Sequence, residues 1–268
     1  MINWPSYDPG EHRIQCPACG RGDSDKTLGL TIESGGYGVA HCFRCAFVEN
    51  YRPKQGAHLA MLTQPRIKGT PSIAKRETLA NYARDLWAVS KPLGGIGVAY
   101  LEARHCRVPP RDADLRWHPS LRHPCGYEGP ALIALVTDAV TAEPISLHRT
   151  WIRDDGRKAD LEYPRLLLGD GHRKQGGVIR LWPDDAVTTG LGIAEGIETA
   201  LSLAHGFTPV WALIDAGNLA AFPHLPGIQT LMIGSDNDPT GSKAAYTCAE
   251  QWALADREVT LVEVGHGA

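Results

Sequence analysis

Residues 234–241, GSDNDPTG, place two carboxylates, Asp236 and Asp238, one residue apart. The six residues before them, IQTLMI at 228–233, are typical of a buried strand. A proline and a glycine follow, and residues 242–255 have the pattern of a helix. Two negative charges beside an apolar core repel each other unless a cation lies between them. This strand end is therefore a candidate binding site.

Strand and helix patterns alternate through the C-terminal part of the chain. We expect strands at 191–194, 209–214, 228–233 and 258–264, and helices at 197–205, 218–222 and 242–255. This alternation predicts a mainly parallel sheet covered by helices, in which ligands bind beyond the carboxyl ends of the strands. Glu195 directly follows the strand at 191–194, so we expect it to meet Asp236 and Asp238 at one edge.

Three converging carboxylates suit a hard divalent cation. Oxygen ligands of this kind favour Mg²⁺ or Mn²⁺, with water and substrate phosphates completing the coordination. An ordinary turn with exposed acidic residues is the alternative. The spacing of the two aspartates also resembles the start of an EF-hand loop, but the residue that would close that loop is Thr247 rather than a glutamate, which argues against it.

The chain has seven cysteines, four of which form two C-x-x-C pairs. Cys16 and Cys19 precede alternating residues at 28–32, a turn at 34–36 and alternating residues at 37–41, and Cys42 and Cys45 follow them. A hairpin here would bring both pairs together, and four thiolates match a structural Zn²⁺ site. The alternatives are incidental cysteines or a redox pair. The remaining cysteines, Cys106, Cys125 and Cys248, are scattered.

The charge distribution limits the partners. The net charge of −3 argues against a globally basic coat for nucleic acid, but not against a local basic groove. Residues 51–76 carry six basic and no acidic side chains and fit either a solvated linker or a tether that contacts phosphates. The glycine-rich basic loop 169–177, GDGHRKQGG, fits either a mobile loop or a phosphate contact. No apolar run approaches the ~18 residues of a membrane span, and the N-terminal residues, MINWP, do not resemble a signal peptide.

Several motifs resemble one family. IAEGIETALS at 193–202, followed by GSDNDPTGSKAA at 234–245, resembles the Toprim domain of primases, topoisomerases and some nucleases. CPACG and HCFRCA, which contain the four cysteines, resemble the zinc ribbon of DnaG-type and phage replicative primases. The motifs YLEARHC, LRWHP, HRTW and GGVIRLW resemble primase-like proteins of phages, plasmids and integrated elements.

The resemblance implies an α+β multidomain fold. The expected parts are a β zinc ribbon at 1–50, a flexible basic linker at 51–76, a mixed α/β primase subdomain at 77–185 and a Rossmann-like α/β Toprim domain at 186–268. It further implies Glu195, Asp236 and Asp238 as catalytic residues that bind Mg²⁺ or Mn²⁺, beside a structural Zn²⁺. The candidates for contacts to template or nucleotide phosphates are Arg149, Lys158, Arg165 and Lys243.

The implied activity is synthesis of short RNA primers on single-stranded DNA from ribonucleoside triphosphates. A replicative helicase is the implied further partner, and the cytoplasm of a bacterial host or phage-infected cell is the implied location. No G-x-x-x-x-G-K-[ST] motif is present, so no P-loop helicase motor is expected.

Two departures from the family pattern keep other functions open. Family members often carry an acidic residue four positions after the strand-end glutamate, where this chain has Thr199, with Glu198 one earlier. The acidic motif that usually follows the last strand does not occur before Ala268, so either the sequence is truncated or a second metal is weakly held. The alternatives are a non-catalytic DNA-binding or regulatory Toprim protein of a mobile element and a metal-dependent Toprim nuclease.

Overall fold

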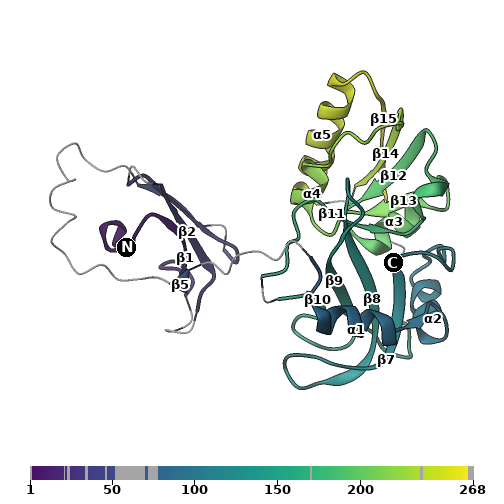
Figure 1. Ribbon diagram of the computed structural model, residues 1–268, viewed down its shortest axis with the longest axis horizontal. Coiled ribbons are helices and arrows are strands. Elements are labelled where there is room, and N and C mark those ends of the chain that lie inside the picture. Colours follow the sequence, from purple (N-terminus) through teal and green to yellow (C-terminus); the bar gives the residue numbers. More distant parts are fainter. Residues whose placement is uncertain are drawn as a thin grey trace. The chain divides into compact units, whose positions relative to one another are not determined.

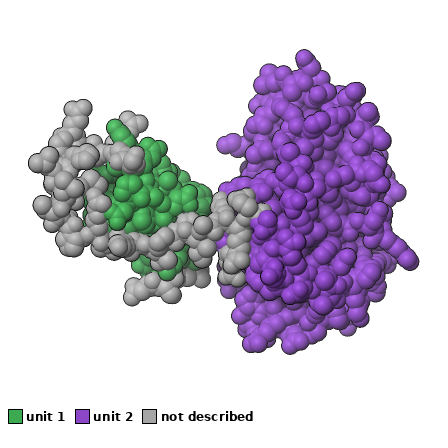
Figure 2. All heavy atoms as spheres, viewed as in Figure 1, with its two compact units in different colours: residues 1–74 green, residues 75–268 purple. Residues whose placement is uncertain are grey.

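The structure is a computed structural model (Figure 1), and it describes residues 2–20, 22, 25–33, 36–45, 47–51, 70–71, 78–169, 171–235 and 238–264. The chain divides into two compact units, residues 1–74 and 75–268 (Figure 2). Most of the expected basic linker, 52–69 and 72–76, lies outside the described residues, as does Asp236. In the part that is described, no helix has both the length and the apolar character needed to cross a membrane.

The first unit is an antiparallel sheet of five strands in the order β4-β3-β2-β1-β5. These strands are β1 (Gly10–Ile14), β2 (Leu28–Ile32), β3 (Gly38–Cys42), β4 (Val48–Tyr51) and β5 (Thr70–Pro71), and a short 3₁₀ helix, η1 (Trp4–Ser6), precedes them. β2 and β3 form the predicted hairpin, with Leu28 opposite Cys42 and Leu30 opposite Ala40. These four side chains point to one face, and with Ile2, Trp4, Cys16 and Ile32 they form the small buried core of this unit.

The second unit contains one sheet of ten strands. Its strands are β6 (Lys91–Pro92), β7 (Leu115–Arg122), β8 (Glu128–Asp138), β9 (Pro144–Trp151), β10 (Arg165–Leu167), β11 (Gly177–Arg180), β12 (Gly190–Ala194), β13 (Val210–Ala212), β14 (Thr230–Ser235) and β15 (Glu258–Glu263). Its helices are α1 (Asn81–Val89), α2 (Ile96–Ala103), α3 (Ile197–Leu203), α4 (Ala216–Ala220) and α5 (Pro239–Leu254), with a 3₁₀ helix, η3 (Asp184–Ala186).

The sheet has an antiparallel and a parallel half. The main path runs β10-β9-β8-β11-β13-β12-β14-β15, and β7 pairs with both β6 and β8. β13, β12, β14 and β15 are mutually parallel, and β11 pairs antiparallel with both β8 and β13. The expected boundary between 77–185 and 186–268 therefore falls within one continuous sheet, and the division into these two domains stays a prediction.

Helices cover both faces of the parallel half (Figure 1). Leu191 and Ile193 of β12 pack into the cluster that contains Trp252 of α5, whereas Ala194 packs into the cluster that contains Leu203 of α3. Glycine at position 192 of β12 leaves room for its neighbours, because a Cβ there would lie 2.7 Å from Val210 Cγ1 of β13 and 3.3 Å from Leu203 Cδ2 of α3. The predicted strand–helix alternation and the predicted α+β fold class are both confirmed.

Candidate functional site

The four paired cysteines form a metal-type cluster in the first unit. Their sulfur atoms all lie within 4.8 Å of one another, with Cys16 Sγ 3.7 Å from Cys45 Sγ and Cys19 Sγ 3.7 Å from Cys42 Sγ. A regular tetrahedron with Zn–S bonds of about 2.3 Å has edges of about 3.8 Å. The four thiols therefore fit a structural Zn²⁺ in both ligand type and spacing.

The surroundings of the cluster hold its loops in place. Arg44, between Cys42 and Cys45, forms a bidentate pair with the buried Asp25, at 3.2 Å for each hydrogen bond. The Arg44 amide N–H also donates to Cys42 Sγ over 3.4 Å, a contact that favours a thiolate. Within the described residues this is the one group of three or more potential metal ligands that lie this close together.

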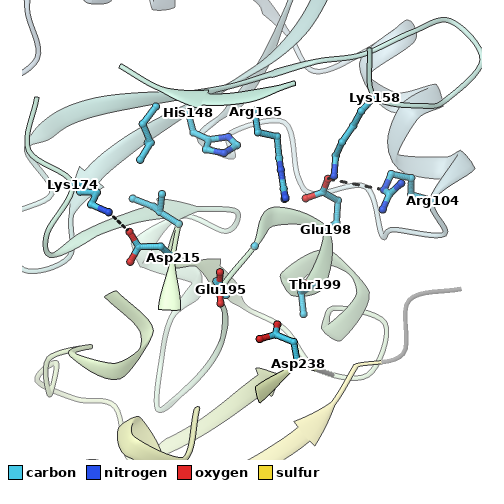
Figure 3. A pocket seen from close by; sticks show the side chains of 13 residues that line it. Arg104, His148, Lys158, Arg165, Lys174, Glu195, Glu198, Thr199, Asp215 and Asp238 are labelled. Atoms are coloured by element: carbon cyan, nitrogen blue, oxygen red, sulfur yellow. Dashed lines mark hydrogen bonds and ion pairs between the residues drawn. The ribbon is translucent and has the colours of Figure 1, made fainter. Parts of the chain in front are cut away.

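A pocket of about 580 Å³ opens at the carboxyl ends of three parallel strands in the second unit (Figure 3). Glu195 directly follows β12, Asp215 follows β13 and Asp238 follows β14, and all three line the pocket. The sequence had predicted that Glu195 and Asp238 meet at this edge. Asp215 carries the same strand-end signal but was not among the expected site residues.

Backbone amides at two helix N-termini orient two of these carboxylates. Asp238 caps α5, where its Oδ1 accepts from the N–H groups of Thr240 at 2.8 Å and Gly241 at 2.9 Å. Asp215 caps α4 through the N–H of Asn218 at 2.9 Å, and its other oxygen pairs with Lys174 Nζ at 2.9 Å. These contacts fix where the carboxylates lie before any ligand binds.

The oxygen donors fit Mg²⁺ or Mn²⁺ in type. Glu195 is half-buried and Asp238 is exposed, and both side chains border the same cavity. The third expected ligand, Asp236, lies outside the described residues. Glu195 and Asp238 are thus the described residues that would hold such an ion, and its binding remains a prediction.

Cations face the carboxylates from the antiparallel half of the sheet and the neighbouring loops. Arg104, Lys158, Arg165 and Lys174 line the pocket, together with His148 (Figure 3). Arg165 extends from β10, is exposed and forms no ion pair with any residue that the structure describes. Burial lowers the pKa of His148 to about 4, so its ring is neutral at pH 7.

The strand register decides which of the four basic candidates reach this pocket. In the β8–β9 pair, His148 lies opposite Ala134 and Arg149 lies opposite Ile133, and these two partners belong to clusters on opposite faces. Arg149 therefore points away from the pocket, where its Nη2 donates to the Leu167 carbonyl at 2.9 Å and burial lowers its pKa. The structure thus places His148, not Arg149, at the site.

The remaining basic residues also differ in whether they line the pocket. Lys158 and Arg165 line the pocket, whereas Lys243 lies exposed on α5 and does not line it. Lys174 comes from the glycine-rich loop 169–177, for which a phosphate contact was one of two expectations. Arg104 follows α2 and lies within the motif YLEARHC, but it was not among the expected site residues, because only the packing of α2 brings it to this edge.

Comparisons with known families define the class of the C-terminal part. Residues 190–268 match the Toprim domain, and residues 77–181 match a domain of unknown function, DUF7146. A comparison with curated proteins gave no significant match. The chain therefore carries a C-terminal Toprim domain, as the motifs at 193–202 and 234–245 had indicated, beside its four-cysteine cluster.

Solved structures similar to this chain include three primases. A DNA primase domain from Pseudomonas aeruginosa is 13% identical, with a TM-score of 0.46 over 70% of this chain and 71% of that chain. The zinc-binding and RNA polymerase domains of the Aquifex aeolicus primase are 14% identical, with a TM-score of 0.45 over 97% of this chain and 74% of that chain. The primase fragment of the bacteriophage T7 primase-helicase protein is 16% identical, with a TM-score of 0.41 over 93% of this chain and 88% of that chain.

Proposed function

We propose that this protein is a DNA primase that synthesises short RNA primers on single-stranded DNA by metal-dependent nucleotidyl transfer. The observation that carries the proposal is the Toprim pocket, in which Glu195 and Asp238 lie opposite Arg165 and Lys158. Such an arrangement provides oxygen ligands for a cation on one wall and cationic side chains for phosphates on the other. Both are needed to align a triphosphate with an attacking hydroxyl.

Each residue has a role that its position supports. A divalent ion held by Glu195, Asp238 and Asp236 would neutralise the triphosphate and activate the attacking 3′-hydroxyl. Glu195, half-buried at the end of β12, is also the proposed general base. Arg165 projects into the pocket without an ion-pair partner among the described residues, so its guanidinium can bind phosphate oxygens.

The zinc ribbon is the proposed reader of the template. Phe43, in the turn between the second pair of cysteines, is 64% exposed, and the guanidinium of Arg13 lies 4.3 Å from the centre of its ring. His41 packs edge-on against the same ring at 4.9 Å. An exposed aromatic ring beside the Arg13 guanidinium suits stacking of unpaired bases and contact with the DNA backbone. The proposed partners are accordingly single-stranded DNA and ribonucleoside triphosphates.

Three further parts of the proposal rest on the sequence resemblance. They are a replicative helicase as partner, a phage, plasmid or other mobile element as source, and the cytoplasm of the bacterial host or phage-infected cell as location. They are separate from the chemistry of the pocket and do not affect its test.

The experiment uses the full chain with mixed-sequence single-stranded DNA, labelled ribonucleotides and either Mg²⁺ or Mn²⁺. The wild-type protein should form short labelled primers, and Glu195→Gln should form none. Glu250→Gln is the matched control, because Glu250 is an exposed glutamate on α5 that does not line the pocket. Loss of synthesis in both variants would point to a general defect rather than to the proposed site.

End-labelled template in the same reactions tests the alternatives. Shortening of the template without primer formation, abolished by Glu195→Gln, would identify a metal-dependent nuclease. Binding of template with neither reaction would identify a non-catalytic DNA-binding protein. Either result would refute the primase proposal.

A further inference from the structure

Glu198 is a second glutamate of the pocket, in the first turn of α3 and three residues after Glu195. Its side chain is 12% exposed. One of its oxygens, Oε1, lies 2.9 Å from Lys158 Nζ, 2.7 Å from the hydroxyl of Tyr100 and 4.0 Å from Arg104 Nε. Two hydrogen-bond donors and a more distant guanidinium group thus face a single carboxylate oxygen.

These contacts hold Glu198 in its charged form. Burial alone would raise the pKa of Glu198, but the attraction of Lys158 and the hydrogen bonds from Lys158 and Tyr100 outweigh it and lower that pKa to about 2. Figure 3 shows the Glu198 side chain turned toward Lys158 and Arg104, away from Asp238. Its negative charge is therefore already compensated by protein cations.

The contacts of Glu198 tie together three segments that are distant in sequence. Tyr100 and Arg104 belong to α2 and its C-terminal cap, and Tyr100 is 1% exposed in the core. Lys158 belongs to the connection between β9 and β10, where it pairs with Ile152 in an isolated β-bridge. The Cys106 thiol donates to the backbone carbonyl of Glu198 over 3.6 Å, so the helix turn itself is also held.

We propose that Glu198 is a positioning residue that holds Lys158 and Arg104 at the wall of the pocket, and that it is not a ligand of the catalytic metal. This inference rests on the proposed nucleotide-binding role of the pocket. An ammonium group has three N–H donors, and Glu198 takes one of them. A lysine held in this way can offer its remaining donors to a phosphate with less loss of side-chain freedom.

The proposal also accounts for the departure from the family pattern. Thr199 stands where family members often have an acidic residue, and its side chain is buried, with the residue only 2% exposed. Glu198, one position earlier in the first turn of α3, points in a different direction from Thr199, because successive residues of a helix point about 100° apart. The acidic residue is thus directed to the cationic wall instead of to Asp238.

The first test measures metal binding and needs no catalytic activity. Mn²⁺ is titrated into the full chain, and free Mn²⁺ is followed by electron paramagnetic resonance. Glu198→Gln should keep the Mn²⁺ affinity within about twofold of the wild type, whereas Glu195→Gln should weaken it at least tenfold. Equal weakening by both substitutions would make Glu198 a ligand and overturn the proposal.

The second test reads the position of Lys158 directly. The full chain is treated with a low dose of an acetylating reagent, and the labelling rate of each lysine is measured by mass spectrometry. Glu198→Gln should raise the labelling rate of Lys158 at least threefold. Lys174, which pairs with Asp215 in the same pocket, is the internal control and should not change. An unchanged rate at Lys158 would overturn the proposal.

The third test asks whether Glu198 acts through Lys158. Glu198→Gln should change the KM for ribonucleotides at least threefold when Lys158 is present, and should leave it within twofold when Lys158 has been replaced by Met. A merely smaller folded fraction would lower kcat without changing KM. No change in KM, or the same change in both backgrounds, would overturn the proposal.

The tests can still be carried out if the Glu198→Gln variant does not fold. Glu198→Asp keeps the charge and shortens the side chain by one methylene, so it replaces Glu198→Gln if the latter does not fold. It should raise the labelling of Lys158 and leave Mn²⁺ affinity unchanged, and the opposite pattern would overturn the proposal. If no variant or wild-type protein makes primers, the primase proposal fails, while the metal-binding and labelling arms still decide the role of Glu198.

Discussion

Replacing Cys42 by Ser should separate the two functions assigned to the two units. Cys42 is fully buried, belongs to the four-cysteine cluster that fits Zn²⁺, and is part of the small core of the first unit. The variant should lose Zn²⁺ and unfold this unit, because little else stabilises it. If the ribbon reads the template as proposed, the start of a primer depends on it and should be abolished. Extension of an annealed primer, which needs the pocket alone, should persist.

The expected loss of stability in the first unit can be worked out from the geometry of the four-cysteine cluster. Sulfur pairs 3.7 Å apart already match the edges of a tetrahedral zinc site, so binding requires little rearrangement. Structural Zn²⁺ binds zinc-finger peptides with about 10–16 kcal/mol of apparent free energy at pH 7. A whole small domain is stable by only about 5–15 kcal/mol. Losing the metal therefore removes as much free energy as such a unit has.

The assay has a matched control within the same chain. Cys125 is an exposed cysteine of the second unit and lies outside the cluster, so Cys125→Ser should retain one Zn²⁺ per chain and both activities. Zinc content is measured with a colorimetric chelator, folding of each unit by limited proteolysis, and initiation and extension on the same templates. If Cys42→Ser lost extension as completely as initiation while residues 78–264 resisted proteolysis, the ribbon would belong to the active site.

Three more predictions concern the second unit and the ribbon surface. The pKa of Glu198 falls from 4.5 to about 2 on folding. Its pairing should therefore contribute about 3 kcal/mol to the free energy of unfolding, fully present above pH 4.5 and lost as the pH falls toward 2. Urea unfolding from pH 7 to pH 3 should show that the difference in this free energy between the wild type and Glu198→Gln becomes smaller. Asp238→Ala should destabilise α5 by about 1 kcal/mol and abolish synthesis, whereas Asp238→Ser should keep the cap and lose only synthesis. Phe43→Ala should weaken binding of single-stranded DNA at least threefold, measured by fluorescence anisotropy, with zinc content unchanged.

Each of these predictions has an outcome that contradicts it. A stability difference for Glu198→Gln that stays constant from pH 7 to pH 3 would show that the ion pair is not responsible. Synthesis by Asp238→Ser at the wild-type rate would remove Asp238 from the metal site. Tyr246→Ala is the control for Phe43→Ala, since Tyr246 is 61% exposed on α5. Equal loss of DNA binding in both variants would show that Phe43 is not a specific contact for single-stranded DNA.

The sequence alone was sufficient for features that depend on local pattern. The alternation of apolar runs with helical periods predicted the parallel half of the sheet and its helices. Six of these seven elements match the expected segments to within two residues at both ends, and α5 begins three residues earlier than expected. The C-x-x-C spacing around a hairpin predicted the sulfur cluster, because the hairpin itself brings its two ends together. Glu195 and Asp238 were predicted to meet because parallel strands present their carboxyl ends at one edge.

Only the tertiary structure decided which cations face those carboxylates. Arg149 and His148 are neighbours in sequence, yet the pairing of β9 with β8 sends them to opposite faces, and a shift of one residue would have exchanged them. Lys158, Arg104 and Glu198 meet because α2, α3 and the β9–β10 connection pack together, although these residues lie 40 to 94 positions apart in the sequence. Contacts of this kind are absent from local periodicity, since they depend on the register and packing of distant elements.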